Sequence, residues 1–298
     1  MPEVIAVDVG GTSIRAAAID IDGELRRERV RETPAADGPD AVVAAVRAAA
    51  RELAGPDVVA AGVVVPGVVD TAAGIARYAT NLGWRDVPLR DLLTADLGVP
   101  VVVEHDVRAA GRAELAFGSA RGAGDCLLVW LGTGIAGVVV ADGRILDGAK
   151  GMAGEIGHVP VWPDGEPCAC GQRGCTEVYA SAAGIARRYL ARTGVRLAAA
   201  EIATRLDTDP AATAVWAEAV DALGLALASG TLLLDPAVIV LGGGLAGAGE
   251  TLRGPVAAAL AARLAWRAAP EVRTSPLAGR AGLLGAGLIA WEAIREGR

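Results

Sequence analysis

The chain has 298 residues, of which 53% are hydrophobic, and its formal net charge is −7 at pH 7. This length suits two lobes better than one small core, and the apolar fraction excludes a disordered chain. The acidic balance argues against a nucleic-acid partner. We find neither a signal peptide nor an uncharged run long enough to span a membrane, so we expect a cytoplasmic protein with no membrane association.

The first part of the chain alternates short apolar strands with turns and helices. Strands are predicted over residues 4–9, 13–20, 58–65 and 99–104, and helices over 40–53 and from about 107 onward. Asp22-Gly23 is typical of a hairpin turn.

A second series of elements begins at residue 126. Strands are predicted over 126–131 and 135–141, with a hairpin turn at Asp142-Gly143. After an irregular stretch over 151–180 the pattern predicts four helices and one buried strand. The helices are expected at roughly 181–206, 211–234, 250–265 and 281–296, and the strand at 238–241.

One arrangement of elements occurs twice along the chain. A strand, a glycine-threonine turn, a second strand and a hairpin turn lie near the N-terminus and again after residue 126. Two such units suggest two related lobes that face each other across a cleft. The alternative is a chance similarity between β-hairpins, and periodicity alone leaves both interpretations open.

The first glycine turn lies in the run Asp8-Val9-Gly10-Gly11-Thr12-Ser13-Ile14-Arg15. Glycines let the backbone approach an anionic ligand closely, and a turn after a strand can aim N–H groups at phosphate oxygens. Thr12 adds a hydroxyl donor, Asp8 can reach a magnesium ion, and Arg15 can neutralise phosphate charge. A single turn of this kind is weak evidence, because most such turns are ordinary hairpins.

Two further glycine turns follow predicted strands. Gly132, Thr133 and Gly134 offer a second phosphate clamp, and Gly242, Gly243 and Gly244 suit close packing against an adenine ring. The triple glycine can equally be a tight strand-to-helix turn. Together, the three turns favour a nucleotide-binding protein that uses ATP with Mg²⁺.

The third feature is a cluster of metal-binding residue types. His158 is followed after nine residues by Cys168, after one more by Cys170 and after four more by Cys175. One imidazole and three thiolates suit tetrahedral zinc, and four protein ligands leave no open position, so we expect a structural Zn²⁺. The alternative is scattered free thiols. Cys126 lies in a predicted buried strand and is expected to be a core residue.

Several carboxylates lie near these motifs. Asp106 follows a predicted strand and is a candidate general base toward a sugar hydroxyl, although an Asp there can also cap a helix. Glu155 precedes a zinc ligand by three residues and Glu177 follows one by two, so both are candidates for binding sugar hydroxyls rather than plain surface residues. Asn81 is a further polar candidate, or a turn-forming residue.

On these motifs the chain resembles the ROK family of sugar kinases, most closely its bacterial ATP-dependent glucokinases, over nearly its whole length. The matching motifs are Asp8-x-Gly10-Gly11-Thr12, Pro66-Gly67, Asn81-Leu82-Gly83-Trp84, Glu104-His105-Asp106, Gly132-Thr133-Gly134, Gly154-Glu155-x-Gly157-His158 and Cys168-x-Cys170-Gly171-x-x-Gly174-Cys175-x-Glu177. The last two resemble the zinc signature of the family, which is highly specific.

The resemblance implies an α/β, two-lobed actin-like ATPase (RNase H-like) fold with a central cleft. Residues 1–116 and the C-terminal helix at about 281–298 are assigned to a small lobe, and 117–280 to a large lobe with the zinc loop and the nucleotide-binding elements. It implies phosphorylation of a hexose at its 6-hydroxyl with Asp106 as base, and a homodimer or homotetramer. The residues implied to bind the sugar are Gly67, Asn81, His105, Asp106, Glu155, His158 and Glu177.

One departure from the family pattern concerns the substrate. The family usually has Asn before the catalytic Asp, whereas this chain has His105. Imidazole is larger than a carboxamide and can carry charge near neutral pH. An amino sugar or an N-acetylhexosamine is therefore an alternative substrate, and a non-catalytic sugar-sensing ROK protein is a further alternative.

His158 connects the zinc cluster with the expected sugar site. If one ring nitrogen binds zinc, the other can face the sugar near Glu155 and Glu177. We therefore expect that removal of the metal reduces the affinity for sugar before it reduces the affinity for ATP.

Overall fold

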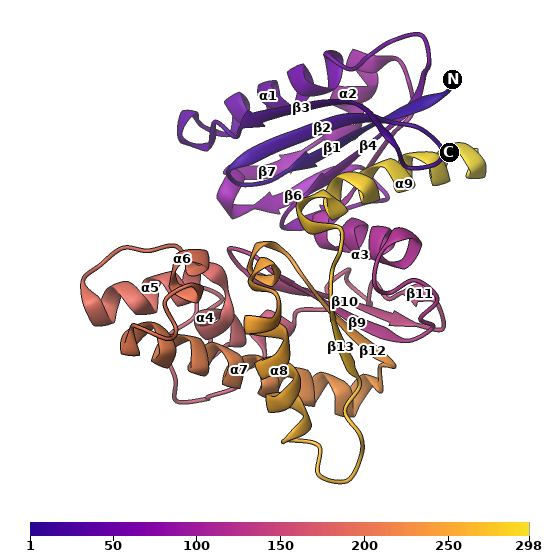
Figure 1. Cartoon of the computed structure of the whole chain (residues 1–298). Coiled ribbons are helices and arrows are strands. Elements are labelled where there is room, and N and C mark those ends of the chain that lie inside the picture. Colours follow the sequence, from indigo (N-terminus) through magenta and orange to yellow (C-terminus); the bar gives the residue numbers. More distant parts are fainter. Residues whose placement is uncertain (298) are drawn as a thin grey trace. The chain divides into compact units, whose positions relative to one another are not determined.

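The computed structural model describes residues 1–297, except the side chain of Ala278. The chain forms two compact units, Met1–Ala113 with Arg280–Arg298, and Glu114–Gly279. Figure 1 shows that the C-terminal helix returns to the N-terminal unit and lies beside its first strands.

The N-terminal unit is built on a five-stranded sheet in the order β3-β2-β1-β4-β8 (Figure 1). Its strands are β1 (Glu3–Val9), β2 (Ser13–Ile19), β3 (Leu25–Glu32), β4 (Val58–Val65) and β8 (Val101–His105). β1 pairs antiparallel with β2 and parallel with β4, and β4 pairs parallel with β8. The carboxyl ends of β1, β4 and β8 therefore lie at the same edge of the sheet.

Alternate side chains of β1 enter two different cores, as the twofold period of a strand requires. Ile5 and Val7 join a cluster that includes residues of α1 (Pro39–Arg51) and α2 (Leu89–Leu97). Val4 and Ala6 join a second cluster with α9 (Ala281–Glu296). The sheet is thus covered on both faces, which explains why its parallel strands are almost entirely apolar.

A small sheet, two 3₁₀ turns and the first part of α3 (Asp106–Phe117) complete this unit. A three-stranded sheet in the order β5-β6-β7 inserts after β4, and α3 follows β8 directly. The strands of the small sheet are β5 (Val68–Asp70), β6 (Ile75–Ala79) and β7 (Trp84–Val87), and two 3₁₀ turns are η1 (Ala35–Asp37) and η2 (Thr80–Leu82).

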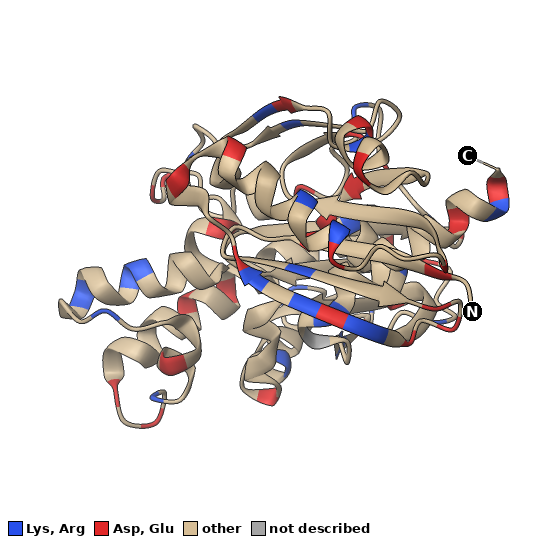
Figure 2. Ribbon diagram, turned by 90° about the horizontal axis from the view of Figure 1, so that it is seen from above, with Lys and Arg blue, Asp and Glu red and all other residues tan. Residues whose placement is uncertain are grey.

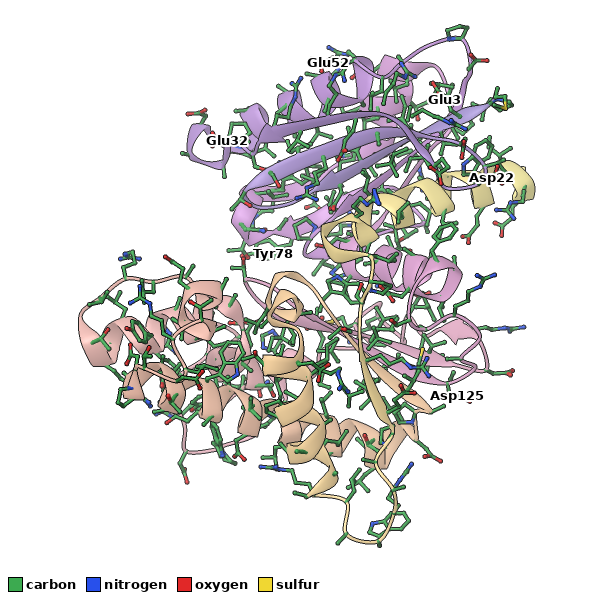
Figure 3. All side chains as sticks on the ribbon, viewed as in Figure 1. Glu3, Asp22, Glu32, Glu52, Tyr78 and Asp125 are labelled. Atoms are coloured by element: carbon green, nitrogen blue, oxygen red, sulfur yellow. The ribbon has the colours of Figure 1, made fainter. Side chains whose placement is uncertain are left out.

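The edge strand β3 carries charges of both signs. Arg27 pairs with Glu3 and Arg31 with Glu52 at 2.5 Å, and Figure 3 labels both glutamates beside this sheet. In Figure 2, acidic and basic residues are interspersed along the ribbon. Charges on an edge strand discourage pairing with another chain.

The second unit repeats the topology of the first. Its sheet has the order β11-β10-β9-β12-β13, with β9 antiparallel to β10 and parallel to β12. The strands are β9 (Cys126–Leu131), β10 (Ile135–Ala141), β11 (Arg144–Ile145), β12 (Val238–Gly242) and β13 (Glu271–Thr274). The predicted repeat of strand, glycine turn, strand and hairpin turn is confirmed, because both sheets contain it in the same place.

The helices of the second unit pack on this sheet around α7 (Pro210–Leu234), which contributes Leu223 and Leu227 to a core with β9. The others are η3 (Ile156–His158), α4 (Thr176–Ala180), α5 (Ala182–Thr193), α6 (Ala199–Ala203), η4 (Gly244–Ala248), α8 (Glu250–Ala261) and η5 (Ala278–Arg280). Within the described chain, α7 is the one helix long and apolar enough to cross a membrane. Half of its most apolar stretch is buried within the protein, as in a core helix.

Two expectations about elements need correction. The helix predicted over 181–206 is two helices, because Gly194 adopts a left-handed conformation with φ of 73° and ends α5. The helix expected to reach residue 265 ends at Ala261. The small sheet, α2 and β13 were not predicted, since short strands on the surface have weak periodicity.

Candidate functional site

The carboxyl edge of the first sheet collects the candidate catalytic residues of the N-terminal unit. Asp8 of β1 pairs with Val64 of β4, and Val65 pairs with His105 of β8. Asp106 then begins α3. Parallel pairing therefore brings two carboxylates and an imidazole to one edge, although they are about one hundred residues apart in sequence.

Asp106 is held by its own helix. Its Oδ1 accepts a hydrogen bond of 2.8 Å from the N–H of Val107, and the side chain stays 30% exposed. Nδ1 of His105 lies 3.5 Å from the same oxygen. The carboxylate is thus oriented by the backbone and open on one side, as a group that accepts a proton from a ligand must be.

The turn that carries these two residues depends on Glu104, which is not among the predicted site residues. Glu104 is 5% exposed, and its Oε1 accepts hydrogen bonds from the N–H of His105 at 2.7 Å and from Arg108 at 2.7 Å. Thr71 donates to the same oxygen at 3.2 Å. The only signal in the sequence is an acid and an arginine spaced four residues apart across a strand–helix junction.

The ionisation of Asp8 is coupled to this edge. Burial, and then the negative charge of Asp106, raise the pKa of Asp8 from 3.8 to about 7, and the nearby Arg15 opposes the shift. A partly buried carboxylate of this kind gains most from a cation. Carboxylate oxygen is the ligand that Mg²⁺ prefers, so the chemistry of Asp8 fits the predicted role in holding magnesium.

The first glycine turn is a tight, well-tethered loop. The N–H of Gly10 donates to the carbonyl of Ser13 at 2.9 Å, and the Thr33 hydroxyl donates to the carbonyl of Gly10 at 2.6 Å. The N–H of Thr33 also donates to the carbonyl of Thr12 at 3.1 Å. Thr33, which directly follows the last residue of β3, thus holds the loop in place. It was not singled out from the sequence.

Gly11 and Asn81 meet, although seventy residues separate them in sequence. A Cβ at Gly11 would lie 2.8 Å from the amide nitrogen of Asn81, which sits exposed on η2. Gly67 has φ of 91°, and a Cβ there would overlap the carbonyl oxygen of Tyr78. Gly67 therefore requires glycine for close approach, and the Asn81 side chain is brought to the first glycine turn.

In the second unit, the Gly132–Gly134 turn joins β9 to β10. The N–H of Gly132 donates to the carbonyl of Gly134 at 2.9 Å. Glu177 lies directly against this turn: its Oε2 accepts from the N–H of Ile135 at 2.8 Å, and a Cβ at Gly134 would lie 2.5 Å from the same oxygen. Glu177, predicted as a sugar ligand, is thus bonded to the residue that follows this glycine turn.

The triple glycine ends β12. A Cβ at Gly242 would lie 2.9 Å from the Trp130 ring, and one at Gly243, which has φ of 83°, would lie 2.6 Å from the carbonyl oxygen of Leu131. Gly244 has no heavy atom within 4 Å of its Cβ position. The first two glycines are required by packing, and the third leaves a bare backbone at the start of η4.

The predicted metal ligands form one cluster. The ligand atoms of His158, Cys168, Cys170 and Cys175 all lie within 4.8 Å of one another. Nδ1 of His158 lies 3.8 Å from the sulfur of Cys168, and the sulfurs of Cys170 and Cys175 are 3.7 Å apart. Tetrahedral zinc with Zn–S bonds of about 2.3 Å requires sulfur separations of about 3.8 Å, so the donor set and its spacing fit zinc.

The other ring nitrogen of His158 faces a carboxylate. Nε2 lies 3.9 Å from Oε2 of Glu155, while Nδ1 is the nitrogen on the side of the thiols. Burial raises the pKa of the Cys175 thiol to about 12, so this thiol is protonated unless a cation displaces its proton. Cys126 is buried in β9 and stands apart from the cluster, as expected.

A group of residues not singled out from the sequence braces the metal loop. The Tyr179 hydroxyl accepts from the N–H of Glu166 at 2.7 Å, and its ring contacts Trp162 edge-on with centroids 4.3 Å apart. Arg188 lies over the Tyr179 ring at 4.7 Å and bonds Glu166 at 2.7 Å. Aromatic residues spaced through an irregular loop gave no periodic signal.

The geometry thus gathers two sets of predicted residues, each within its own unit. The first set is Asp8, Gly10, Gly11, Thr12, Arg15, Asn81, His105 and Asp106. The second is Gly132, Thr133, Gly134, Glu155, His158, Glu177 and the three cysteines of the cluster. Glycine turns can bind phosphate through their N–H groups, and carboxylates next to them can accept a proton from a hydroxyl.

Comparisons with known proteins agree with this chemistry. A model of the ROK family matches residues 4–293. A glucokinase of Halalkalibacterium halodurans is 37% identical over 311 residues, covering 96% of this chain and 94% of that protein. An N-acetylmannosamine kinase of Citrobacter koseri is 36% identical over 183 residues, covering 61% of this chain and 62% of that protein.

A solved structure is similar over the whole chain. The crystal structure of a ROK family glucokinase from Streptomyces griseus, in complex with glucose and AMPPNP, has a TM-score of 0.85 to this chain at 32% identity. The similarity covers 97% of this chain and 99% of that one.

Proposed function

Because the chain belongs to the ROK family and is an ATP-dependent sugar kinase, we propose that it phosphorylates a hexose at the 6-hydroxyl, with Asp106 as general base. The resemblance inferred from the sequence is confirmed by the family model, which matches residues 4–293. The predicted fold class is confirmed as well, since the chain shares the actin-like ATPase fold of ROK kinase structures.

The observation that supports Asp106 as the base is its position at the carboxyl edge of the sheet. It lies beside His105 and interacts electrostatically with Asp8, and its side chain is partly exposed. As the sugar oxygen bonds to the terminal phosphorus of ATP, Asp106 takes the hydroxyl proton and ADP departs. The glycine turns donate N–H groups to the phosphates, and Mg²⁺ held by Asp8 would neutralise their charge.

The residues proposed to bind the sugar come from both units. In the N-terminal unit they are Gly67, Asn81, His105 and Asp106; in the second unit they are Glu155, His158 and Glu177. The metal cluster is proposed to be a structural zinc site. The enzyme is proposed to act in the cytoplasm as a homodimer or homotetramer, which light scattering of the purified protein would test.

The direct test is replacement of Asp106 with Asn, which keeps an acceptor for the Val107 N–H but cannot take a proton. We expect kcat to fall at least 10²–10⁴-fold, the range for general-base catalysis, with sugar affinity largely retained. ADP release and sugar binding would be measured on the same samples. Turnover near the wild-type rate would show that another group is the base.

A second substrate class is favoured by His105, which occupies the position of the usual Asn. Similarity to an N-acetylmannosamine kinase supports an amino sugar or N-acetylhexosamine as the alternative. The test is a panel of hexoses and hexosamines with the wild type and His105→Asn. We expect the variant to shift the ranking toward glucose, and an unchanged ranking would remove His105 as the specificity residue. The non-catalytic alternative is not retained, because the chain is an enzyme.

A further inference from the structure

Two hydrogen bonds tie the second phosphate loop to the helices that follow the metal cluster. The N–H of Ala182 donates to the carbonyl of Gly132 at 2.9 Å, and the N–H of Ile135 donates to Oε2 of Glu177 at 2.8 Å. One bond is to the first residue of the loop and the other is to the residue directly after it. Ile135 is 3% exposed, so its bond to a carboxylate is shielded from water and correspondingly strong.

Both sides of Ile135 contact segments that carry metal ligands. Its N–H bonds Glu177, which is two residues after Cys175. Its carbonyl oxygen packs against Gly157, which is one residue before His158, and a Cβ at Gly157 would overlap that oxygen. The first residue of β10 is therefore held between the two chain segments that the metal would join.

Several protein contacts besides the metal ligands join these segments, among them the hydrogen bond from the N–H of Glu166 to the Tyr179 hydroxyl at 2.7 Å. The N–H and the hydroxyl of Thr176 donate to the carbonyl of Val159 at 3.0 and 3.1 Å, and Pro160 forms an isolated bridge with Cys175. The intervening stretch contains one further isolated bridge, between Pro167 and Arg173. A metal ion bound by four ligands would cross-link this stretch and fix the start of α4, where Glu177 lies.

We propose that Glu177 is a positioning residue for the phosphate loop, through which the metal cluster controls nucleotide affinity. Glu177 fixes the N–H of Ile135 and hence the adjoining backbone of Gly132–Gly134. This inference rests on the proposed function, in which that loop binds the phosphates of ATP. It differs from the expectation drawn from the sequence, that metal loss reduces sugar affinity first, because Glu177, two residues after a metal ligand, contacts the phosphate loop.

The test measures ADP affinity by titration calorimetry without sugar, so that a contact between Glu177 and sugar plays no part. Glu177→Ala is expected to bind ADP about tenfold or more weakly than the wild type, the range for loss of a charge-assisted hydrogen bond. Glu177→Gln retains an acceptor and should recover most of the affinity. Asp164→Ala is the matched control: Asp164 is an exposed acidic residue between His158 and Cys168 and is outside the proposed binding residues, so ADP affinity should be unchanged.

Metal removal completes a cycle. Wild type treated with 1,10-phenanthroline, which leaves Mg²⁺ free, should lose ADP affinity to the level of Glu177→Ala and regain it when zinc is restored. The same treatment of Glu177→Ala should cause little further loss, because both changes release the same contact. Additive losses, or unchanged ADP affinity after either change, would overturn the inference.

The outcomes separate this inference from the proposed function. A wild type that binds no ADP contradicts the nucleotide site itself. If the wild type and Glu177→Ala bind ADP equally tightly, the control of nucleotide affinity through Glu177 is contradicted, but the nucleotide site is not. If Glu177→Ala fails to fold, Glu177→Gln, metal-depleted wild type and untreated wild type are compared instead. Equal ADP affinity in all three overturns the proposal.

Discussion

The charge of Asp8 depends on the residues that the sheet places around it. Its pKa is raised to about 7, mainly by burial and then by Asp106. Between pH 3.8 and about 7 the folded protein thus binds a proton that the unfolded chain has lost. Asp8 therefore lowers the free energy of unfolding as the pH rises through this window, and its effect is absent at lower pH.

Asp8→Asn should remove this pH dependence. We make the comparison without Mg²⁺ or nucleotide. We expect the free energies of unfolding of the variant and the wild type to be more similar near pH 4 than at neutral pH. The variant should gain on the wild type by up to about 1.4 kcal/mol per pH unit toward pH 7. Urea unfolding at several pH values measures this, and parallel pH profiles would contradict it.

At the scale of elements, glycines set how closely the metal loop approaches β10. A Cβ at Gly157 would overlap the carbonyl oxygen of Ile135, and the carbonyl of Gly154 accepts from the N–H of Gly137 at 2.7 Å. This close packing holds the segment from Gly154 to Gly157 against the first residues of β10. A residue with a side chain at either glycine would move the loop away from the strand.

Gly157→Ala should therefore destabilise the protein by about 1–3 kcal/mol, the usual cost of overpacking. Gly124→Ala is the matched control in the same unit, because its Cβ would have no heavy atom within 4 Å. That change should be close to neutral in urea unfolding. Equal effects of the two substitutions would show that the approach of the loop to β10 is not restrictive.

The cysteines of the metal loop and the cysteine of strand β9 are expected to differ in role. Cys168 belongs to the ligand cluster, whereas burial raises the pKa of Cys126 in β9 to about 11. We expect one zinc per wild-type chain by elemental analysis, loss of that zinc in Cys168→Ser, and its retention in Cys126→Ser. Zinc retained by Cys168→Ser would contradict the proposed ligand set.

At the scale of the whole molecule, each unit has its own hydrophobic core. The clusters around β1 belong to the N-terminal unit, and the cluster around α7 belongs to the unit that holds the metal ligands. Removal of the metal should therefore lower the stability of the second unit and leave that of the N-terminal unit unchanged.

Hydrogen exchange measures this response. Removal of zinc should increase amide exchange in the metal loop, α4 and the start of β10, and leave the exchange of β1 and β4 unchanged. The buried strands of the first sheet serve as the control within the same sample. A rise in exchange in both sheets would show that the metal stabilises the protein as a whole.

Much of this protein could be predicted from the sequence because its signals are local. Apolar runs ended by glycine predicted β1, β4, β9 and β12, since a buried strand must be apolar and a close turn needs glycine. The spacing of His158 and the three cysteines predicted the metal cluster, because a short loop can wrap one ion.

Other features exist only because of tertiary packing. The raised pKa of Asp8, the buried acceptor Glu104 and the bond from Ile135 to Glu177 each join residues that no local pattern connects. Sequence determined which chemical groups this protein has and in which elements they lie. Tertiary structure decided which carboxylate meets which partner, because burial and pairing between distant strands set the distances on which charge and hydrogen bonding depend.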